Sequence, residues 1–135
     1  MHNETVQELV YNPYTFDTNK RSMYIVYEDT AIYEFQCTFG NLFSSKHTIT
    51  KLINHLNKAF NAGIEFAQRN NLKMTYPDLM DISPFTIATV DKFMYSTEVI
   101  NYRGGLFMKC NDSDNIKNYA TLFNAAYREG IYSLR

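Results

Sequence analysis

The second half of this chain repeats the first. When residues 47–64 are laid on residues 114–131 without a gap, Asn57 coincides with Asn124 and Gly63 with Gly130. The apolar positions also stay in phase, and the Pro-aromatic-Thr segment 13–16 matches residues 84–87 in the same order. A repeat period this long is typical of a duplicated supersecondary unit. The alternative is that amphipathic helices drawn from an Asn-, Ile- and Tyr-rich composition resemble each other by chance.

The chain is the size of one domain. Its 135 residues include 45% hydrophobic residues, with only 3 Pro and 5 Gly, so a packed core is expected and disorder is not. We therefore predict a single α+β domain made of two related halves, in which antiparallel strands precede a helix that packs on their sheet. The first half spans residues 6–72, a joint covers residues 73–83, and the second half spans residues 84–135.

Alternating apolar and polar residues predict strands in both halves. The clearest alternation runs through residues 31–39, and it gives one face to the core and the other to water. The Arg103-Gly104-Gly105 segment predicts the turn of a hairpin in the second half. The expected strands are residues 6–11, 14–18, 23–28 and 31–39, and then 85–95, 98–102 and 106–110.

Apolar residues at three- and four-residue steps predict one helix in each half. In the first half the expected buried stripe is Ile49, Leu52, Ile53, Leu56, Phe60, Gly63, Ile64 and Ala67. The opposite, solvated face is Lys51, Asn54, Asn57, Lys58, Asn61, Glu65 and Gln68, and the helix ends at Asn70-Asn71. The last helix is predicted over residues 115–129, with Gly130 as its stop and Ile116, Tyr119, Ala120, Phe123 and Tyr127 on its buried face.

The sequence carries no pattern typical of catalysis. It has no phosphate-binding glycine loop, no GxSxG element and no HExxH metal helix, and His47 and His55 are spaced too far apart to chelate one metal from a helix face. Cys37 and Cys110 end strand-like runs and are expected to be buried thiols. We therefore expect a protein that is not an enzyme and needs neither a cofactor nor a metal. The absence of a signal peptide or a membrane-spanning run predicts a cytoplasmic location.

Aromatic side chains on the predicted strands are the remaining candidates for a binding surface. There are 11 Tyr and 10 Phe, and alternation sends about half of the strand aromatics away from one core face. Such rings stack on bases or anchor a protein partner, and nearby cations would frame them. The candidate contact residues are Lys20, Arg21, Tyr24, Tyr27, Lys92, Tyr102, Arg103, Phe107 and Lys109. The alternative is tyrosines packed on a sheet with solvated lysines at its edges.

One segment carries a resemblance to a known family. The segment Tyr14-Thr15-Phe16-Asp17, a polar turn, and Arg21-Ser22-Met23-Tyr24-Ile25 is similar to the repeat of PUR and Whirly-type single-stranded nucleic-acid-binding proteins. The resemblance covers this segment and the order of elements. It implies nucleic-acid contacts by Lys20, Arg21 and Tyr24. The glycine that the family has in the turn is missing, and the net charge of −1 also departs from the family.

We expect a small, non-catalytic protein-interaction module. Its composition is typical of a low-GC bacterium or its phage, so a phage or mobile-element factor that binds or inhibits a host protein is the preferred hypothesis. The alternative function is single-stranded DNA or RNA binding of the PUR or Whirly type. Outward aromatics and uncovered strand edges, including residues 6–11 and the tail 131–134, also predict a two-fold homodimer.

Overall fold

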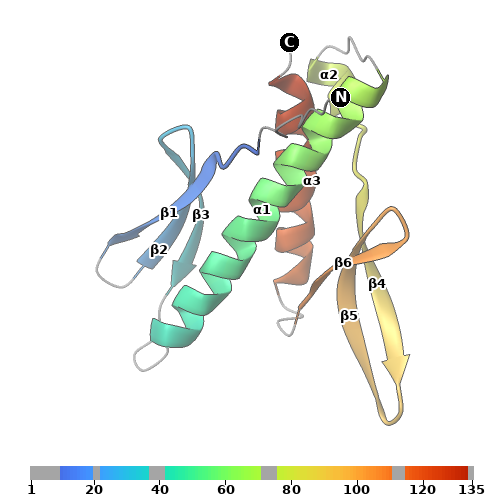
Figure 1. Cartoon of the computed structure of the whole chain (residues 1–135). Coiled ribbons are helices and arrows are strands. Elements are labelled where there is room, and N and C mark those ends of the chain that lie inside the picture. Colours follow the sequence, from blue (N-terminus) through green and yellow to red (C-terminus); the bar gives the residue numbers. More distant parts are fainter. Residues whose placement is uncertain (1–9, 20–21, 37–41, 71–75, 111–114, 134–135) are drawn as a thin grey trace, which may run out of the picture.

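The protein folds as two three-stranded sheets on either side of a pair of helices (Figure 1). The computed structural model describes residues 10–19, 22–36, 42–70, 76–110 and 115–133. In chain order the elements are β1 (Tyr14–Asn19), β2 (Ser22–Tyr27), β3 (Thr30–Gln36), α1 (Leu42–Asn70), α2 (Tyr76–Leu79), β4 (Phe85–Lys92), β5 (Tyr95–Tyr102), β6 (Gly105–Lys109) and α3 (Ile116–Tyr132). Both sheets are antiparallel meanders, β1-β2-β3 and β4-β5-β6, so the predicted α+β fold of two strands-plus-helix halves is confirmed.

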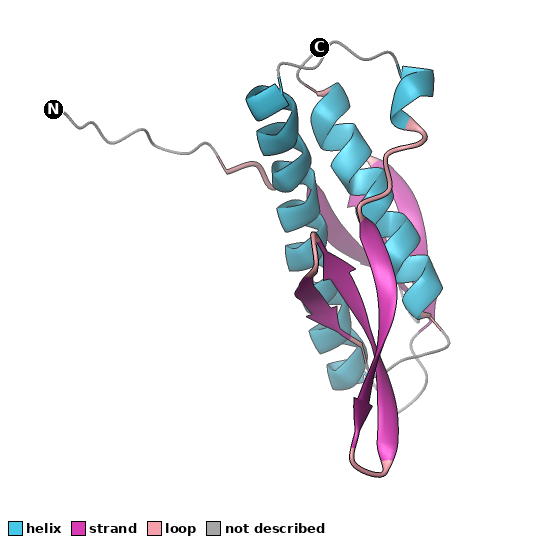
Figure 2. Ribbon diagram, turned by 90° about the vertical axis from the view of Figure 1, so that its right-hand side faces the viewer, coloured by secondary structure: helices cyan, strands magenta, loops and turns pink. Residues whose placement is uncertain are grey.

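The two long helices form the centre of the molecule and have the most extensive contact of any two elements. Figure 2 shows them side by side, with strands along them. The two helices approach closely because each has a glycine where they cross. A Cβ on Gly63 would collide with the backbone carbonyl of Tyr127, and one on Gly130 with that of Phe60. These are matched positions of the repeat, so the crossing is symmetric.

The two halves repeat the same contacts. The side-chain amide of Asn57 bonds both the backbone N–H and the C=O of Tyr14, at 2.9 and 3.2 Å. Asn124 does the same to Phe85, at 2.8 and 3.0 Å. Each of these strand-initial rings then stacks on an aromatic of the second strand, Tyr14 on Tyr27 and Phe85 on Tyr102. The register shift in the second strand also recurs, between Ile25 and Val26 and between Ile100 and Asn101.

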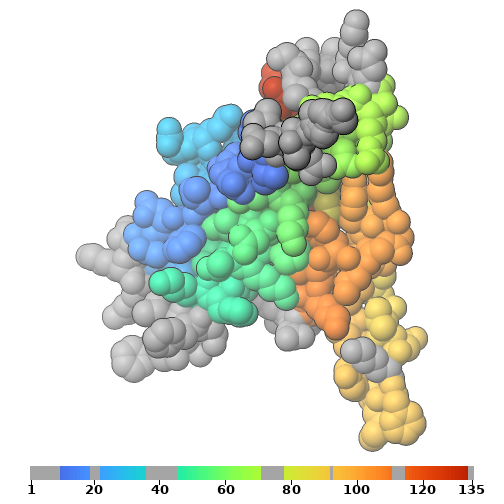
Figure 3. Space-filling model, viewed as in Figure 1, coloured from blue at the N-terminus to red at the C-terminus, as the bar shows by residue number. Residues whose placement is uncertain are grey.

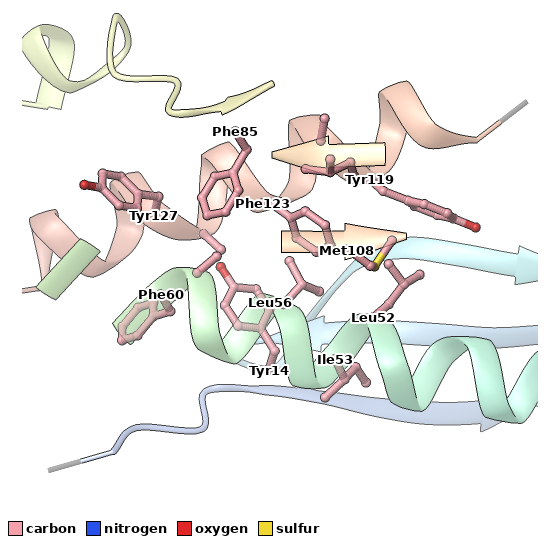
Figure 4. Packing of buried hydrophobic residues seen from close by; sticks show 14 of the residues in the cluster. Tyr14, Leu52, Ile53, Leu56, Phe60, Phe85, Met108, Tyr119, Phe123 and Tyr127 are labelled. Carbon is pink, nitrogen blue, oxygen red and sulfur yellow. The ribbon is translucent and has the colours of Figure 1, made fainter. Parts of the chain in front are cut away.

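The core lies between the helix pair and the inner faces of both sheets (Figure 4). All eight positions of the predicted α1 stripe are buried, as are all five predicted for α3. Leu56 and Phe123 are completely buried. Each sheet packs on both helices, since Tyr33 of β3 contacts Tyr119 of α3 and Phe107 of β6 contacts His55 of α1.

Several predicted boundaries were wrong. Helix α3 continues through Gly130 to Tyr132, because the glycine is required at the helix crossing and is not a stop. Residues 131–132 therefore belong to a helix and offer no strand edge. Residues 10–12 form no strand, and the rest of the predicted strand 6–11 lies outside the described residues. Residues 76–79 form the short helix α2 where a turn was expected.

Polar side chains in the helices also differ from the prediction. Asn57 was assigned to the solvated face but is 8% exposed, because its amide bonds Tyr14. His55 was expected to be solvated and is half-buried. Its Nδ1 donates to the carbonyl of Lys51 at 2.7 Å, and its ring meets the edge of Phe107 at 5.1 Å. The helical pattern does not show the contact of Asn57 with Tyr14 or that of His55 with Phe107, since both depend on a strand from elsewhere in the chain.

The free energy of unfolding should decrease as the pH falls, because His55 becomes protonated. Burial lowers the pKa of His55 below its ordinary value, with the nearby Lys58 and Lys51 adding to the effect. The unfolded chain then binds more protons than the folded one, so the contribution of neutral His55 is complete above about pH 6.5 and is lost as the pH falls. Urea unfolding between about pH 8 and pH 5 should show this loss.

Replacing His55 with glutamine should flatten the pH dependence of urea unfolding. The matched control is His47→Gln, because His47 is exposed on the same helix. The wild type and this control should both show a steeper pH dependence than His55→Gln. Equal slopes for the wild type and His55→Gln would contradict the assignment.

Candidate interaction surface

Three of the predicted contact residues face the helices. Tyr27 stacks on Tyr14, and its hydroxyl donates to Glu129 at 3.2 Å. Tyr102 stacks on Phe85, and Phe107 lies 4.6 Å from the same ring. These side chains bind the sheets to the core, so packing accounts for their aromatic character.

Of the other candidates, Tyr24 and Lys109 lie on different sheets. Tyr24 lies on the outer face of β2, where its strand partners are Asp17 and Glu34. Lys109 is exposed at the end of β6, on the other sheet. Lys20 and Arg21 lie outside the described residues. Lys92 ends β4, but the position of its side chain is also outside the description.

Arg103 forms the turn between β5 and β6. Its guanidinium lies 5.7 Å from the ring of Phe66 and 5.5 Å from that of Tyr102. Next to it, burial and a hydrogen bond with Tyr102 raise the pKa of Tyr127 well above its usual range. The Tyr127 phenol therefore stays protonated at physiological pH. This cluster consists of a cation held over rings and a neutral phenol, which is an arrangement for packing.

The feature that the sequence reasoning missed is an arm made by β4 and β5. We use "the arm" for residues 89–98, the part of this hairpin that extends beyond β6. Residues 85–95 were predicted as one strand, but the chain turns at Phe93-Met94. The arm projects from the body of the molecule (Figure 3). At its tip Phe93 is 91% exposed and Met94 is 88% exposed, and Tyr95 beside them is also exposed.

The two faces of the arm differ in chemistry. On one face Ser96 donates to the carboxylate of Asp91 at 2.7 Å, and Glu98 follows Ser96 at the next alternate position. On the other face Val90 pairs with Thr97. The available signal was two large apolar residues between two strand patterns, where a turn normally carries polar residues. The turn is also unusual in its backbone, since Met94 has a φ of 78°, in the region that favours glycine.

A small groove lies where β6 ends against the helices. It has a volume of about 290 Å³. Buried apolar side chains form its floor, and three basic residues border it. We call it the basic groove, and its lining residues are His47, Thr48, Lys51, Leu52, Met108, Lys109, Cys110 and Tyr119. The Lys51 ammonium donates to the backbone carbonyl of Lys109 at 3.1 Å, which ties α1 to the end of β6.

A larger hollow of about 510 Å³ lies between residues 10–12 and α1. Amide side chains dominate its lining. Two of them are already engaged, because Asn57 bonds Tyr14 and Asn61 bonds both the N–H and the C=O of Tyr11. These bonds hold the chain that enters β1 onto the helix. The hollow is therefore explained by the attachment of this segment.

Within the described residues, no group of three His, Cys, Asp or Glu side chains is placed to hold a metal ion. The described helices include none long and apolar enough to cross a membrane. No known protein family, curated protein or solved structure matches this chain.

Proposed function

We propose that this protein is a small non-catalytic module that binds another protein through the arm. The observation that carries this proposal is the exposure of Phe93 and Met94 at the tip of a projecting hairpin. Neither side chain belongs to the core cluster, so neither stabilises the fold. Adjacent large apolar side chains that remain in water are typical of an interaction site, and aromatic residues are common at the energetic centre of protein interfaces.

Charge favours a protein over a nucleic acid as the partner. The arm carries two carboxylates, Asp91 and Glu98, and one cation, Lys92, and the outer face of the first sheet carries Asp17 and Glu34 on either side of Tyr24. Carboxylates repel phosphates, whereas nucleic-acid binding depends on cations that neutralise them. Among the described residues, the groups with displaced pKa values are His55 and Tyr127, which lie in aromatic packing and line neither the basic groove nor the larger hollow. This arrangement supports a binding role and not a catalytic one.

The tip residues should be needed for binding but not for folding. Replacing both Phe93 and Met94 with serine should change the free energy of unfolding by less than about 0.5 kcal/mol, because neither is packed. The same change should abolish capture of the partner from a lysate of cells that make the protein. Urea unfolding and affinity capture measure the two effects.

Leu106→Ser is the matched control, since Leu106 is also exposed and apolar but lies in β6, away from the tip of the arm. The control variant should capture the partner as well as the wild type does. Equal capture by the tip variant would contradict the proposal. If the tip variant lowers the free energy of unfolding more than the control variant does, the tip side chains pack against the rest of the protein.

The alternative function is tested by its salt dependence. Single-stranded DNA and RNA are titrated at several salt concentrations, with the wild type beside a Lys20→Ala, Arg21→Ala double variant. Phosphate contacts would make the affinity fall steeply as salt rises. Tight, salt-steep binding that the double variant loses would reverse the proposal in favour of PUR or Whirly-type nucleic-acid binding. The narrower hypothesis of a phage factor that blocks a host protein is decided by the identity of the captured protein.

A further inference from the structure

We propose that the protein bound by the arm is a second copy of this chain. In the dimer the two arms lie antiparallel, and each tip enters the basic groove of the partner. This inference rests on the proposed function, since it names the partner of the same arm. It is carried by the strand pairing of the arm, by the position of the groove and by their opposite charges.

The arm has a strand edge on the side that β6 leaves uncovered. In the described part of the chain, β6 pairs with β5 only from Val99 to Tyr102, while β4 runs along the other edge of β5 as far as Tyr95. Residues 96–98 therefore present backbone groups toward the side where β6 has ended. Such an edge readily pairs with another chain.

The basic groove lies at the base of that edge. Lys109, which borders the groove, is the strand partner of Val99, the residue next to the uncovered edge. A chain that paired with residues 96–98 would continue the line of β6 and run directly toward the groove. The arm cannot fill its own groove, because its tip at Phe93 is about 20 Å of extended strand from Val99 and points away from the body (Figure 1).

The tip and the groove are chemically complementary. Two apolar side chains at the tip, Phe93 and Met94, match a floor of buried apolar side chains. The carboxylate of Asp91, two positions before Phe93, matches the basic border of His47, Lys51 and Lys109, whereas Glu98 lies at the base of the arm next to Val99. A volume of about 290 Å³ is at the lower end of the range for ligand sites. It suits a large side chain better than a cofactor.

Symmetry closes the assembly at two chains. Antiparallel pairing of one β5 edge with the same edge of another copy has a two-fold axis between the strands. Each tip then reaches the base of the partner's arm, so both grooves fill at once. The same patch serves both chains, which is the arrangement of a closed dimer and leaves no open end for further growth.

The test is a charge exchange between arm and groove, measured by light scattering. The wild type should have twice the 15.8 kDa mass of the chain at micromolar concentration. An arm variant, Asp91→Lys, should dimerise at least about tenfold more weakly, because like charges then face each other. A groove variant, Lys51→Glu with Lys109→Glu, should show the same loss.

An equimolar mixture of the two variants should recover the dimer. The reversed arm then meets the reversed groove, and the wild-type arm meets the wild-type groove, so both contacts are restored. Recovery in the mixture supports the inference and also shows that both variants are folded. Failure to recover, or a groove variant that dimerises like the wild type, overturns it.

The failure of this inference and that of the proposed function are distinguishable. A wild type that is a clean monomer would overturn the dimer. If the Phe93→Ser, Met94→Ser variant then loses capture of a foreign protein, the arm still binds a protein, and only the identity of its partner was wrong.

Discussion

Gly63→Ala and Gly130→Ala should each lower the free energy of unfolding by about 3 kcal/mol or more. The added Cβ would strike a backbone carbonyl of the opposite helix, that of Tyr127 or of Phe60. A backbone atom cannot rotate away as a flexible side chain does, so the two helices would have to separate. Because both sheets pack on this helix pair, the loss should spread through the whole core. Urea unfolding measures the change.

The sign of this effect makes the test decisive. Alanine in a helix interior is intrinsically better than glycine by about 1 kcal/mol, so a loose helix crossing would be stabilised by either substitution. Gly105→Ala is the matched control. An added Cβ there would meet only the carbonyl oxygen of Tyr102 at 3.7 Å, which is an ordinary contact. A gain in stability in either helix variant would contradict the close crossing.

Asn57→Leu and Asn124→Leu should each cost roughly 2–6 kcal/mol, because each leaves a buried backbone N–H and C=O without their partner. Leucine is close to asparagine in size, so the substitution leaves little empty space. The decrease in the free energy of unfolding then measures the lost hydrogen bonds. The two amides act on the first residues of β1 and β4, Tyr14 and Phe85. Both strands are at the edge of their sheets. The amide thus takes the place of a neighbouring strand and ties each sheet to its helix.

Matched controls exist on both helices. Asn54 and Asn118 are exposed asparagines, so Asn54→Leu and Asn118→Leu should change the unfolding free energy by less than about 0.5 kcal/mol. The two buried positions should behave alike, because they are equivalent in the repeat. A large cost at one and none at the other would mean that the halves do not share this attachment.

The two halves differ in the lengths of their helices, since α1 has 29 residues and α3 has 17, and in the lengths of their hairpins. The first hairpin, β1–β2, is six residues on each side, and the second, β4–β5, is eight. The added length, together with a third strand of five residues in β6 against seven in β3, leaves the arm extending beyond its sheet. The two halves thus share the contacts of the body of the molecule, and the hairpin in which they differ is where we place binding.

Local pattern determined the composition of the core and the order of elements. The stripe from Ile49 to Ala67 has a helical period that no strand can satisfy, so all its positions were predictable as buried. The end of α1 at Asn70 and the hairpin turn at Arg103-Gly104 were also predictable, because both depend on the conformational preferences of neighbouring residues.

Only the tertiary structure decided the roles of Asn57, Gly130 and Phe93. Asn57 looks solvated and Gly130 looks like a helix stop until the opposite strand or helix is in place. In the sequence Phe93 looks like one more aromatic residue of a strand. In the structure the chain turns at Phe93, past the end of β6. Each role depends on partners distant in the sequence or on the absence of packing. The periodicity of the sequence indicates which residues are suited to burial, but the contacts of the folded chain decide which of them are buried.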